Sequence, residues 1–339
     1  MYRPLVSVII VNWNGMHYLK DCMESLFKTS YKNTEIFFVD NASSDESVAY
    51  VRKNYPTVKI IQNKENLGFA EGHEGAFKKA RGEAILLLSM DTIVAKNLLE
   101  ELTRGLYAEK NIGVVQPKVI IYPDKVIDSI GSFFLSSGLL YHFGREKDPS
   151  KPIYNKQMDV FSAKGACMLF RKEVLDKTGL FDKDYFAYYE ETDLCMRVWL
   201  AGYKVRYIPS TFIYHKGGGA SGKMVRSYIL FHSQKNRIAT YLKNFSIKYI
   251  LRVLPLTIMM YEAAFIGYLL TGRFGAAWSV QKAIGWNIFH IQSILKKRKH
   301  VQVSIRTVAD DVFMPSLTRK VSPLYYYYQF FGGMGNYVD

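Results

Sequence analysis

The chain has 339 residues, of which 49% are hydrophobic and 22% charged, and this composition is ordinary for a globular protein. Its formal net charge of +15 is unusual and indicates an anionic partner, such as nucleic acid, an acidic membrane surface or a phosphorylated substrate. No zinc-finger, RNP or helix-turn-helix pattern occurs, which disfavours nucleic acid. The three cysteines lack metal-binding spacing and the chain opens without a signal-peptide pattern, so we expect buried thiols and a cytoplasmic protein.

Short apolar runs alternate with helical periodicity through the first ninety residues. The runs lie at 6–11, 35–39, 58–61 and 84–88, and the helical segments at 18–27, 44–52 and 69–80. This alternation predicts a parallel β-sheet flanked by helices. Because ligands of such sheets bind beyond the carboxyl ends of the strands, the residues at those ends are the first candidates for a site.

Each predicted strand ends in amide, hydroxyl or carboxylate side chains. The four ends read Asn12-Trp13-Asn14-Gly15, Asp40-Asn41-Ala42-Ser43-Ser44-Asp45, Asn66-Leu67-Gly68-Phe69-Ala70 and Ser89-Met90-Asp91-Thr92. One such loop is more often turn and capping chemistry, but four at one sheet edge favour a binding site. The first loop has a single glycine where a dinucleotide-binding G-x-G-x-x-G turn needs three, and no Walker A motif occurs.

The later part of the first 225 residues is less regular. Residues 112–141 read as strands and turns, 144–155 as a polar loop and 160–170 as a strand-like run. Aromatic residues at 185–189 then lead into three carboxylates at 190–193, where an amphipathic segment begins. Acidic residues are common in a first helical turn, because the helix dipole favours them there. A carboxylate beside an aromatic wall also suits a general base that acts on a sugar.

These motifs resemble family 2 glycosyltransferases, and especially their rhamnosyltransferase-like branch. The resemblance covers roughly residues 5–300 and is carried by the strand-end motifs at 11–14, 39–45 and 66–70 and by the block 181–219. It implies an α/β GT-A fold with a mostly parallel, Rossmann-like central sheet. The catalytic domain would cover residues 1–225, with a nucleotide-binding half at 1–92 and an acceptor half at 93–225.

The resemblance also implies roles for the residues at the donor side. The nucleoside pocket would be lined by side chains and backbone of the strand-end motifs, namely Asn12, Asn14, Asn41, Asn66 and Gly68. Asp40 would accept from the imide N–H of uracil or thymine, a charge-assisted bond that discriminates against cytosine. Gly165 and Ala166 would leave room for the donor sugar ring. His73-Glu74 departs from the asparagines usual in the family at that place.

Family members usually carry Asp-x-Asp after the fourth strand, where this chain reads Ser89-Met90-Asp91. The resemblance implies that Asp91 and His215 hold Mg or Mn, since a hard divalent ion needs few protein ligands beside substrate phosphates and water. The loop that begins at Lys216, Gly217 and Gly218 would then bind the diphosphate through backbone N–H groups and positive charge. A plain linker is the alternative for this loop.

The reaction implied by the resemblance is inverting transfer through a single displacement. Glu191 would take the proton from the acceptor hydroxyl, and Glu190 is the reserve for that role. Glu190 and Asp193 are also candidates for contacts with the donor sugar or acceptor. Asp193 has an alternative role in fixing the start of the helix.

The chain becomes helical from Tyr228, and apolar segments at 249–270 and 274–294 precede a basic run at 296–300. Pro255 and Glu262 disfavour a clean membrane crossing. We therefore expect that residues 226–300 form amphipathic helices in an acidic membrane interface, with a spanning helix or soluble core helices as alternatives. Residues 301–339 form an aromatic-rich extension for which packing, membrane anchoring and self-association are all open.

Together these features predict a metal-dependent glycosyltransferase at the cytoplasmic face of the cell membrane. It would move a hexose or deoxyhexose from a UDP- or dTDP-sugar, with dTDP-rhamnose as one option, to a lipid-linked saccharide or polysaccharide of the cell envelope. A non-catalytic glycosyltransferase-like scaffold is one alternative, suggested by Ser89. A sugar nucleotidyltransferase is another, but it would need a glycine-rich basic loop after the first strand. Homo-oligomerisation is left open.

Overall fold

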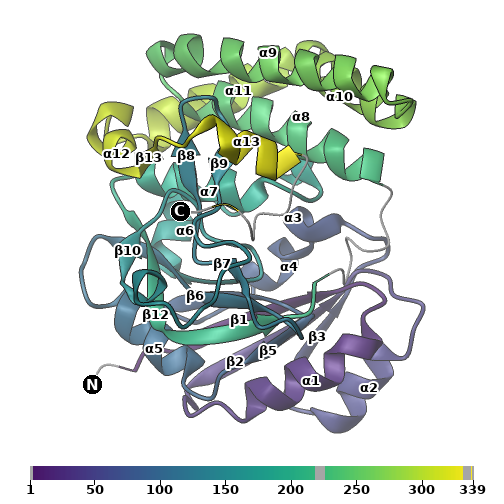
Figure 1. Ribbon diagram of the computed structural model, residues 1–339. Coiled ribbons are helices and arrows are strands. Elements are labelled where there is room, and N and C mark those ends of the chain that lie inside the picture. Colours follow the sequence, from purple (N-terminus) through teal and green to yellow (C-terminus); the bar gives the residue numbers. More distant parts are fainter. Residues whose placement is uncertain (1–2, 218–225, 331–336, 338–339) are drawn as a thin grey trace.

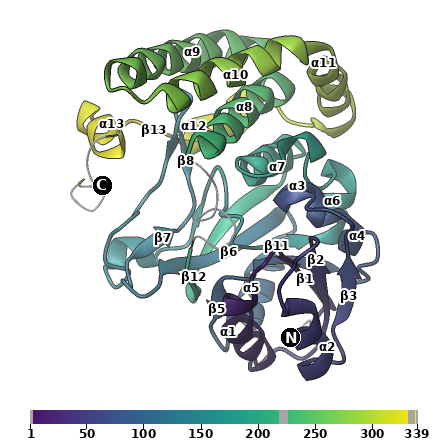
Figure 2. The same ribbon diagram turned by 90° about the vertical axis from the view of Figure 1, so that its right-hand side faces the viewer.

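The computed structural model describes residues 3–217, 226–330 and 337. A mixed central sheet lies between helices on its two faces, and a further layer of helices packs beyond one of them (Figure 1, Figure 2). The strands are β1 (Val6–Asn12), β2 (Thr34–Asp40), β3 (Lys59–Gln62), β4 (Ala84–Ser89), β5 (Thr92–Val94), β6 (Ile112–Ile121), β7 (Ile127–Ser129), β8 (Phe133–Leu135), β9 (Leu140–Tyr141), β10 (Met158–Asp159), β11 (Cys167–Arg171), β12 (Lys204–His215) and β13 (Thr318–Arg319).

The helices follow the same order along the chain. They are α1 (Met16–Phe27), α2 (Ser47–Asn54), α3 (Gly68–Gly72), α4 (Glu74–Phe77), α5 (Leu98–Leu106), α6 (Lys172–Thr178), α7 (Glu190–Leu200), α8 (Arg226–Asn244), α9 (Ile247–Leu270), α10 (Phe274–Phe289), α11 (Ile291–His300), α12 (Asp310–Leu317) and α13 (Pro323–Phe330). Short 3-10 turns η1 (Pro152–Asn155) and η2 (Lys183–Tyr185) and a π-helical turn η4 (Val301–Ile305) complete the described elements.

The four strands predicted from the first ninety residues form the parallel part of the sheet. β1 pairs in parallel with β2 and β4, and β2 pairs in parallel with β3. The register sets Asn12 beside Asp40 and Val11 beside Ser89. The polar strand ends therefore meet at one edge, as the sequence pattern predicts.

The other half of the sheet is mixed, so the parallel arrangement stops at β4. β11 runs antiparallel to both β4 and β6, whereas β12 runs parallel to β6. The last residues of β12 pair antiparallel with β5, and this register sets His215 beside Thr92. His215 is thereby brought to the end of β4, although the two are far apart in the sequence.

The period-two alternation of the strands gives the sheet two apolar faces. In β1, Val8 and Ile10 pack with α1, α2 and α5, whereas Ile9 packs on the opposite side with α6 and α7. The three cysteines are free and buried, as expected, in this apolar interior: Cys22, Cys167 and Cys195.

Two sequence expectations differ from the structure. The single helix expected at 69–80 is two short helices, α3 and α4, that meet at His73, whose buried ring packs on Phe69 and Phe181 and whose Nδ1 lies 2.6 Å from the Phe69 carbonyl oxygen. The strand expected at 160–170 begins only at Cys167. The residues before it bond outside a strand ladder, through Val160 N–H to the Val205 carbonyl.

Helices α8 to α11 form the C-terminal helical layer above α7 (Figure 1). In α9 the buried residues Tyr249, Val253, Thr257 and Tyr261 recur every four positions, so one stripe of the helix packs on the protein. On its other side, large apolar residues such as Leu251, Met259 and Ile266 are exposed. Among the described residues, α9 is the one helix long and apolar enough to cross a membrane, with a mean hydropathy of 1.7 and 17% of its most apolar window buried.

The extension after residue 301 packs against the body where it is described. The Phe313 ring stacks on Trp199 at a centroid distance of 5.8 Å, and β13 pairs with β8. The side chain of Tyr325 is fully buried, and its hydroxyl donates to the Leu140 carbonyl at 3.0 Å. Of the three roles left open for this extension, these contacts support packing.

Candidate active site

A pocket opens at the carboxyl edge of the parallel strands. The lining comes from the ends of β1, β2 and β4, from the β3–α3 loop and from the loop before α7, and it consists of Val11, Trp13, Asn41, Asn66, Gly68, Phe69, Leu88, Ser89, Met90, Asp91, Phe186 and Ala187. Three predicted nucleoside-binding residues and one predicted metal ligand thus share one pocket.

The predicted residues Asn12 and Asp40 lie just behind this pocket and bond to each other. Asn12 is fully buried, and its Nδ2 donates to Asp40 Oδ1 at 3.3 Å and to Ser47 Oγ at 2.8 Å. Asp40 Oδ2 also accepts from the Ser43 N–H at 3.2 Å. A carboxylate offers about four lone-pair sites, so Asp40 retains capacity for a further donor.

Asn14 and Asn66 shape the loops around the pocket through their side-chain oxygens. Asn14 lies in the left-handed region at φ 50°, and its Oδ1 accepts from the Ser44 N–H at 2.8 Å. Asn66 Oδ1 accepts from the Gly68 N–H at 2.9 Å. Asn41 Nδ2 donates to the Gly68 carbonyl at 2.9 Å. The three amides therefore hold two loops in place around one opening.

Gly68 is required by close packing as well as by conformation. Its φ is +72°, and a Cβ at this position would lie 2.5 Å from the carbonyl oxygen of Phe186. The same Phe186 carbonyl accepts from the Ala70 N–H at 2.9 Å. Any side chain here would push the 185–189 loop away from the pocket.

The predicted metal ligands Asp91 and His215 face each other. Asp91 Oδ1 lies 3.5 Å from His215 Nε2, and both side chains are mostly buried. His215 Nδ1 lies 2.8 Å from Asp128 Oδ2 on β7. A carboxylate that accepts from the far nitrogen fixes the ring and turns the other nitrogen toward a metal. Ser89, in place of the family's first aspartate, donates its hydroxyl to Asp91 at 2.5 Å.

The charges around His215 favour a cation at this place. Burial opposes its protonation, but hydrogen bonds to Asp128 and Asp91 outweigh burial and raise the pKa of His215 to about 9. No described cluster has three His, Cys, Asp or Glu ligands of its own. A site with two protein ligands still fits Mg or Mn, because such ions retain water and bind substrate phosphates. Asp128 was not predicted, since no local motif distinguishes it.

The predicted acid pair begins α7 on the other side of Gly165. Tyr189 precedes the pair in the left-handed region at φ 72°, and this turn directs the chain into the helix. Glu190 is buried, and within the described part of the chain the Oε2 atoms of both Glu190 and Glu191 are buried without a hydrogen-bond partner. A Cβ on Gly165 would lie 3.4 Å from the Phe69 ring and 3.9 Å from Glu191 Cβ, so Gly165 separates the pair from the pocket wall.

The two glutamates differ in how readily they ionise. Burial raises the pKa of Glu190 well above its usual range, and the charge of Glu191 raises it further. Burial also raises the pKa of Glu191, but backbone N–H groups and the nearby charge of Lys164 oppose that rise. The two side chains titrate as a pair whose ionisation burial opposes, and Lys164 favours the charged form at Glu191.

Lys164 interacts with both Glu191 of the acid pair and Asp128, the carboxylate that contacts His215. Its ammonium lies 3.6 Å from Asp128 Oδ1, and its charge also acts on Glu191. Next to it, the carbonyl of the predicted residue Ala166 accepts from the Ser89 N–H at 2.9 Å, which ties this segment to the end of β4. Sequence reasoning missed Lys164, because a lysine in a strand-like run carries no signal of its own.

Asp193 points away from the pocket. It is fully buried, and its carboxylate lies 3.0 Å from Arg197 Nη2 and 3.0 Å from Lys243 Nζ. Asn244 Nδ2 donates to it at 2.9 Å. We therefore do not retain the expectation that Asp193 contacts donor or acceptor, and the alternative, that it fixes this part of α7, agrees with these contacts.

The loop after β12 begins beside Asp91 and His215. Lys216 N–H donates to the Asp91 carbonyl at 2.9 Å, and its ammonium lies 2.5 Å from Asp21 Oδ2. The carbonyl of Gly217, at φ +68°, accepts from the Tyr18 hydroxyl at 3.4 Å. Gly218 lies outside the described residues.

Comparison with known proteins places the chain in a family. The model of glycosyl transferase family 2 matches residues 7–179, just over half of the chain. The protein y4gI of Sinorhizobium fredii is 25% identical over 231 residues, which cover 65% of this chain but only 25% of that protein. Glycosyltransferase GlyG of Streptococcus pneumoniae is 26% identical over 225 residues, 64% of this chain and 72% of GlyG.

A further relative is the N-acetylglucosaminyl-diphospho-decaprenol L-rhamnosyltransferase of Mycobacterium tuberculosis. It is 21% identical over 261 residues, 69% of this chain and 83% of that protein.

Solved structures of glycosyltransferases share the fold. GalNAc-T7 with UDP, GalNAc and Mn²⁺ superposes with a TM-score of 0.58 at 19% identity, over 73% of this chain and 49% of that one. The mannosyltransferase PcManGT of Pyrobaculum calidifontis with GDP-Man and Mn²⁺ gives 0.55 at 16% identity, over 90% and 86%. The chain therefore belongs to glycosyl transferase family 2, and it is a glycosyltransferase with the GT-A fold.

Proposed function

We propose that this chain is an inverting, metal-dependent glycosyltransferase that uses a UDP- or dTDP-sugar and acts on a lipid-linked saccharide at an acidic membrane surface. The observation that carries the proposal is that the candidate metal ligands, the pocket amides and the candidate base lie close together. The pair Asp91 and His215 lies at the end of β4 with Asp128 behind it, beside a pocket of strand-end amides, while Glu191 lies across Gly165. A non-catalytic scaffold would not need these groups in one place.

In this proposal the donor nucleotide lies against Asn41, Asn66 and Gly68, with its base directed toward Asp40. Asp91 and His215 would hold Mg or Mn, which supplies positive charge to the departing diphosphate. Relatives support the donor class: GalNAc-T7 was solved with UDP and Mn²⁺, and the Mycobacterium protein is named for rhamnosyl transfer. We include dTDP-rhamnose among the donors on that ground.

The acceptor hydroxyl attacks the anomeric carbon while Glu191 takes its proton. The new bond joins the acceptor oxygen to C1, and the bond between C1 and the diphosphate oxygen breaks on the opposite face. Lys164, near both Glu191 and Asp128, keeps the carboxylate form of the base favoured. Lys216 contributes positive charge and Gly217 a backbone N–H on the diphosphate side.

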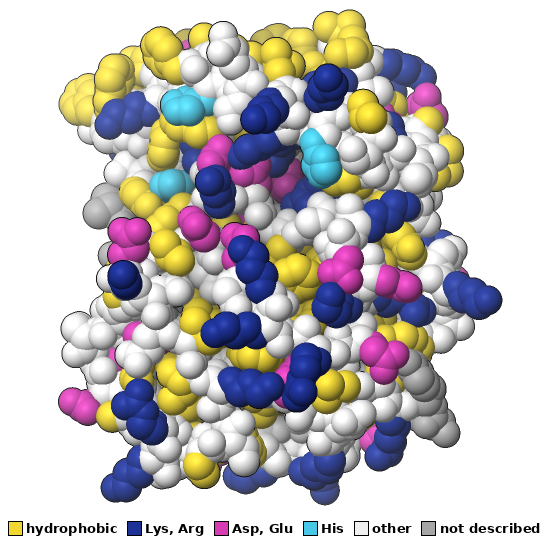
Figure 3. All heavy atoms as spheres, turned by 180° about the vertical axis from the view of Figure 1, so that it is seen from behind, with side chains coloured by type: hydrophobic (Ala, Val, Ile, Leu, Met, Phe, Trp, Pro, Cys, Tyr) yellow, Lys and Arg dark blue, Asp and Glu magenta, His cyan; other side chains and the backbone are white. Residues whose placement is uncertain are grey.

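The membrane part of the proposal rests on the outer face of the helical layer. Large apolar side chains on α9 and α10 are exposed, including Leu251 (70%), Met259 (67%) and Phe289 (87%). Figure 3 shows hydrophobic side chains gathered along the end of the molecule where Figure 1 places these helices. Because α9 packs on the protein through a stripe along its length, it is suited to lie in an interface rather than to cross a bilayer.

One experiment tests the proposal as a whole. The purified full chain is incubated with membranes or lipid-linked saccharides, a panel of nucleotide sugars, and Mg, Mn or EDTA, and the lipid that gains mass is detected. We expect transfer from a uridine or thymidine sugar that EDTA abolishes and that Glu191→Gln lacks. Transfer only from a purine nucleotide sugar, or transfer that persists in EDTA, would contradict the proposed donor and metal.

A further inference from the structure

The loop that leads into α7 is held in an unfavourable backbone conformation. Phe186, Tyr188 and Tyr189 all have positive φ, at 54°, 70° and 72°. Residues with side chains rarely adopt this region, so the surrounding structure must hold it. The same loop supplies Phe186 and Ala187 to the donor-side pocket and ends where the acid pair begins.

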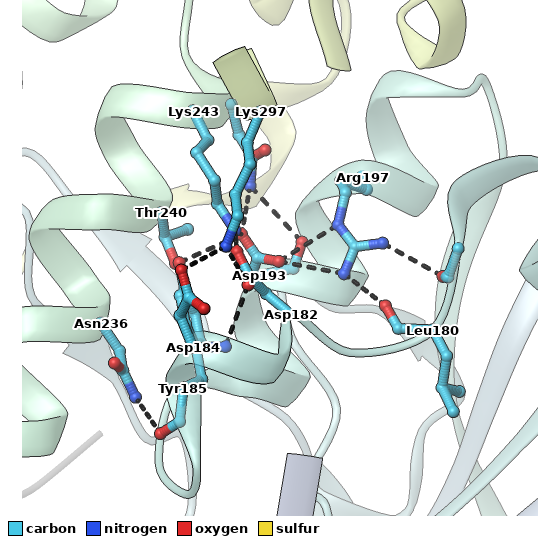
Figure 4. A network of polar contacts seen from close by, with 12 residues as sticks. Leu180, Asp182, Asp184, Tyr185, Asp193, Arg197, Asn236, Thr240, Lys243 and Lys297 are labelled. Atoms are coloured by element: carbon cyan, nitrogen blue, oxygen red, sulfur yellow. Dashed lines mark hydrogen bonds and ion pairs between the residues drawn. The ribbon is translucent and has the colours of Figure 1, made fainter. Parts of the chain in front are cut away.

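Asn236 on α8 holds this loop from behind. It is fully buried, and its Nδ2 donates to the carbonyls of Tyr185 at 3.0 Å, Ala187 at 3.0 Å and Tyr188 at 2.6 Å. Figure 4 shows the Asn236 amide directed at the Tyr185 carbonyl. The opposite orientation would set Oδ1 against three carbonyl oxygens, so the amide has only one favourable orientation. Its Oδ1 is buried and has no hydrogen-bond partner among the residues that the structure describes.

The start of the same segment is held by ion pairs to the helical layer. The Asp182 carboxylate pairs with Lys243 of α8 at 2.6 Å and with Lys297 of α11 (Figure 4). The Tyr185 and Thr240 hydroxyls are hydrogen-bonded at 2.8 Å. Both ends of the segment are thus fixed by residues that lie beyond residue 179, where the family model ends.

On the pocket side the loop contacts α3. The Phe186 carbonyl accepts from the Ala70 N–H at 2.9 Å, two residues after Gly68 of the pocket lining. The loop therefore lies between Asn236 and the donor-side pocket. Loss of the Asn236 hydrogen bonds would therefore act directly on the loop that carries the pocket residues Phe186 and Ala187.

We propose that Asn236 is a positioning residue for the transfer reaction. Through three loop carbonyls it sets the pocket wall at Phe186 and the start of α7, and so the direction of Glu191. The inference rests on the proposed function, because it takes Glu191 as the base and the pocket as the donor site. It makes α8 part of the catalytic apparatus, although sequence reasoning set the domain boundary at 225/226.

Two variants of the full chain test the inference against a matched control. Asn236→Ala removes the donor, and Asn287→Ala removes a buried asparagine of α10 whose Nδ2 donates to the Lys235 carbonyl at 3.1 Å and not to the loop. We expect Asn236→Ala to lower kcat/KM at least tenfold and to speed hydrogen exchange of the 186–191 amides at least tenfold. Asn287→Ala should change both less than threefold at a comparable loss of Tm. Equal effects of the two variants would overturn the inference.

The isosteric Asn236→Asp gives a readout that a purely structural role would not change. A carboxylate facing three carbonyls repels them, whereas its protonated form donates one hydrogen bond. The ratio of variant to wild-type kcat/KM should therefore rise as the pH falls, and a ratio independent of pH would count against the inference. If Asn236→Ala does not fold, Asn236→Asp carries the test alone: hydrogen exchange of the 186–191 amides should be faster than in wild type at the same pH, by a factor that shrinks as the pH falls, and exchange equal to wild type throughout would overturn the inference.

Failure of the inference and failure of the proposed function give different results. Wild-type protein that neither transfers nor hydrolyses any nucleotide sugar overturns the proposed function, and with it a catalytic role for Asn236. The hydrogen exchange measurement then still reports whether Asn236 holds the loop. Active wild-type protein with unchanged exchange and turnover in Asn236→Ala overturns the inference alone.

Discussion

The parallel sheet and the C-terminal helical layer distribute polar and apolar residues in opposite ways. In β1, Val8 and Ile10 are fully buried, and the polar side chains collect past the strand's end, beside an open pocket. In the helical layer, α8 buries Asn236 and Lys243 against the protein, whereas α9 exposes Leu251 to the outside.

At the sheet edge, Asn41 and Asn66 hold the loops and also line the pocket, whereas Asn236 of α8 is buried and holds the loop before α7. The outward apolar face of α9 has no counterpart on the sheet, and burying it would be favourable. The sheet edge thus provides the groups that line the pocket. The helical layer supports the loop before α7 on its inner side and presents a hydrophobic surface on its outer side.

Glu191→Gln should have the largest effect, because it removes the proton acceptor while leaving the sheet edge intact. General-base catalysis contributes roughly 10²–10⁴-fold, so we expect about a 10³-fold loss of kcat. Calorimetry should show that binding of the nucleoside diphosphate changes less than threefold. If Glu190→Gln loses activity and Glu191→Gln does not, the reserve residue is the base.

The wild-type pH profile checks the same assignment. Because burial raises the pKa of Glu191 above the ordinary value of 4.5, the base becomes available only at higher pH. The acid limb of kcat/KM should therefore rise with pH and have its midpoint above 4.5. A midpoint at or below the ordinary value would show that another group limits the reaction.

Asp128→Asn should have the next largest effect, because Asp128 orients His215 rather than binding the ion. Loss of such a supporting carboxylate typically costs roughly 10–100-fold in metal affinity or activity. We expect the Mn concentration for half-maximal activity to rise by about that factor. Asp124→Asn, at an exposed carboxylate nearby in the chain, is the control and should leave the Mn dependence unchanged.

Substitutions on α9 test whether its exposed apolar residues bind the protein to membranes. Leu251→Gln with Met259→Gln should weaken sedimentation with anionic vesicles at least tenfold, since each lost apolar contact forfeits roughly 1.5–3 kcal/mol. Phe27→Gln is the control, because α1 lies at the opposite end of the molecule (Figure 1). Unchanged sedimentation of the double variant would remove α9 from the interface.

Glu190→Gln should have the smallest effect, and on stability rather than on binding. Because the pKa of Glu190 is raised well above its ordinary value of 4.5, ionisation opposes folding increasingly as the pH rises above that value. The neutral variant should therefore melt higher than wild type at pH 7, and the gap should close as the pH falls toward 4.5. Scanning calorimetry at both pH values measures this difference in Tm. A variant that melts lower than wild type at pH 7 would contradict the raised pKa of Glu190.

The sequence by itself determined the elements whose signals are local. Strands β1 to β4 follow from continuous apolar runs, and the polar residues at their ends follow from where those runs stop. Asp91 and the acid pair Glu190 and Glu191 were found in the same way, since each stands at the boundary of an element. The helical nature of α8 to α11 and the apolar character of α9 also follow from periodicity and composition.

Only the tertiary structure decided which of these ends meet and which polar groups line the pocket. Asp128 reaches His215 across 87 positions, and no spacing rule connects them. Asp193 has the same local signal as Glu191, but packing turns it toward Lys243 and Arg197. The physical reason is that local sequence sets an element's type and its ends, whereas sheet register and helix packing set the partners of each side chain. Asn236 belongs wholly to the second class, because its three acceptors exist only once the loop has taken its strained conformation.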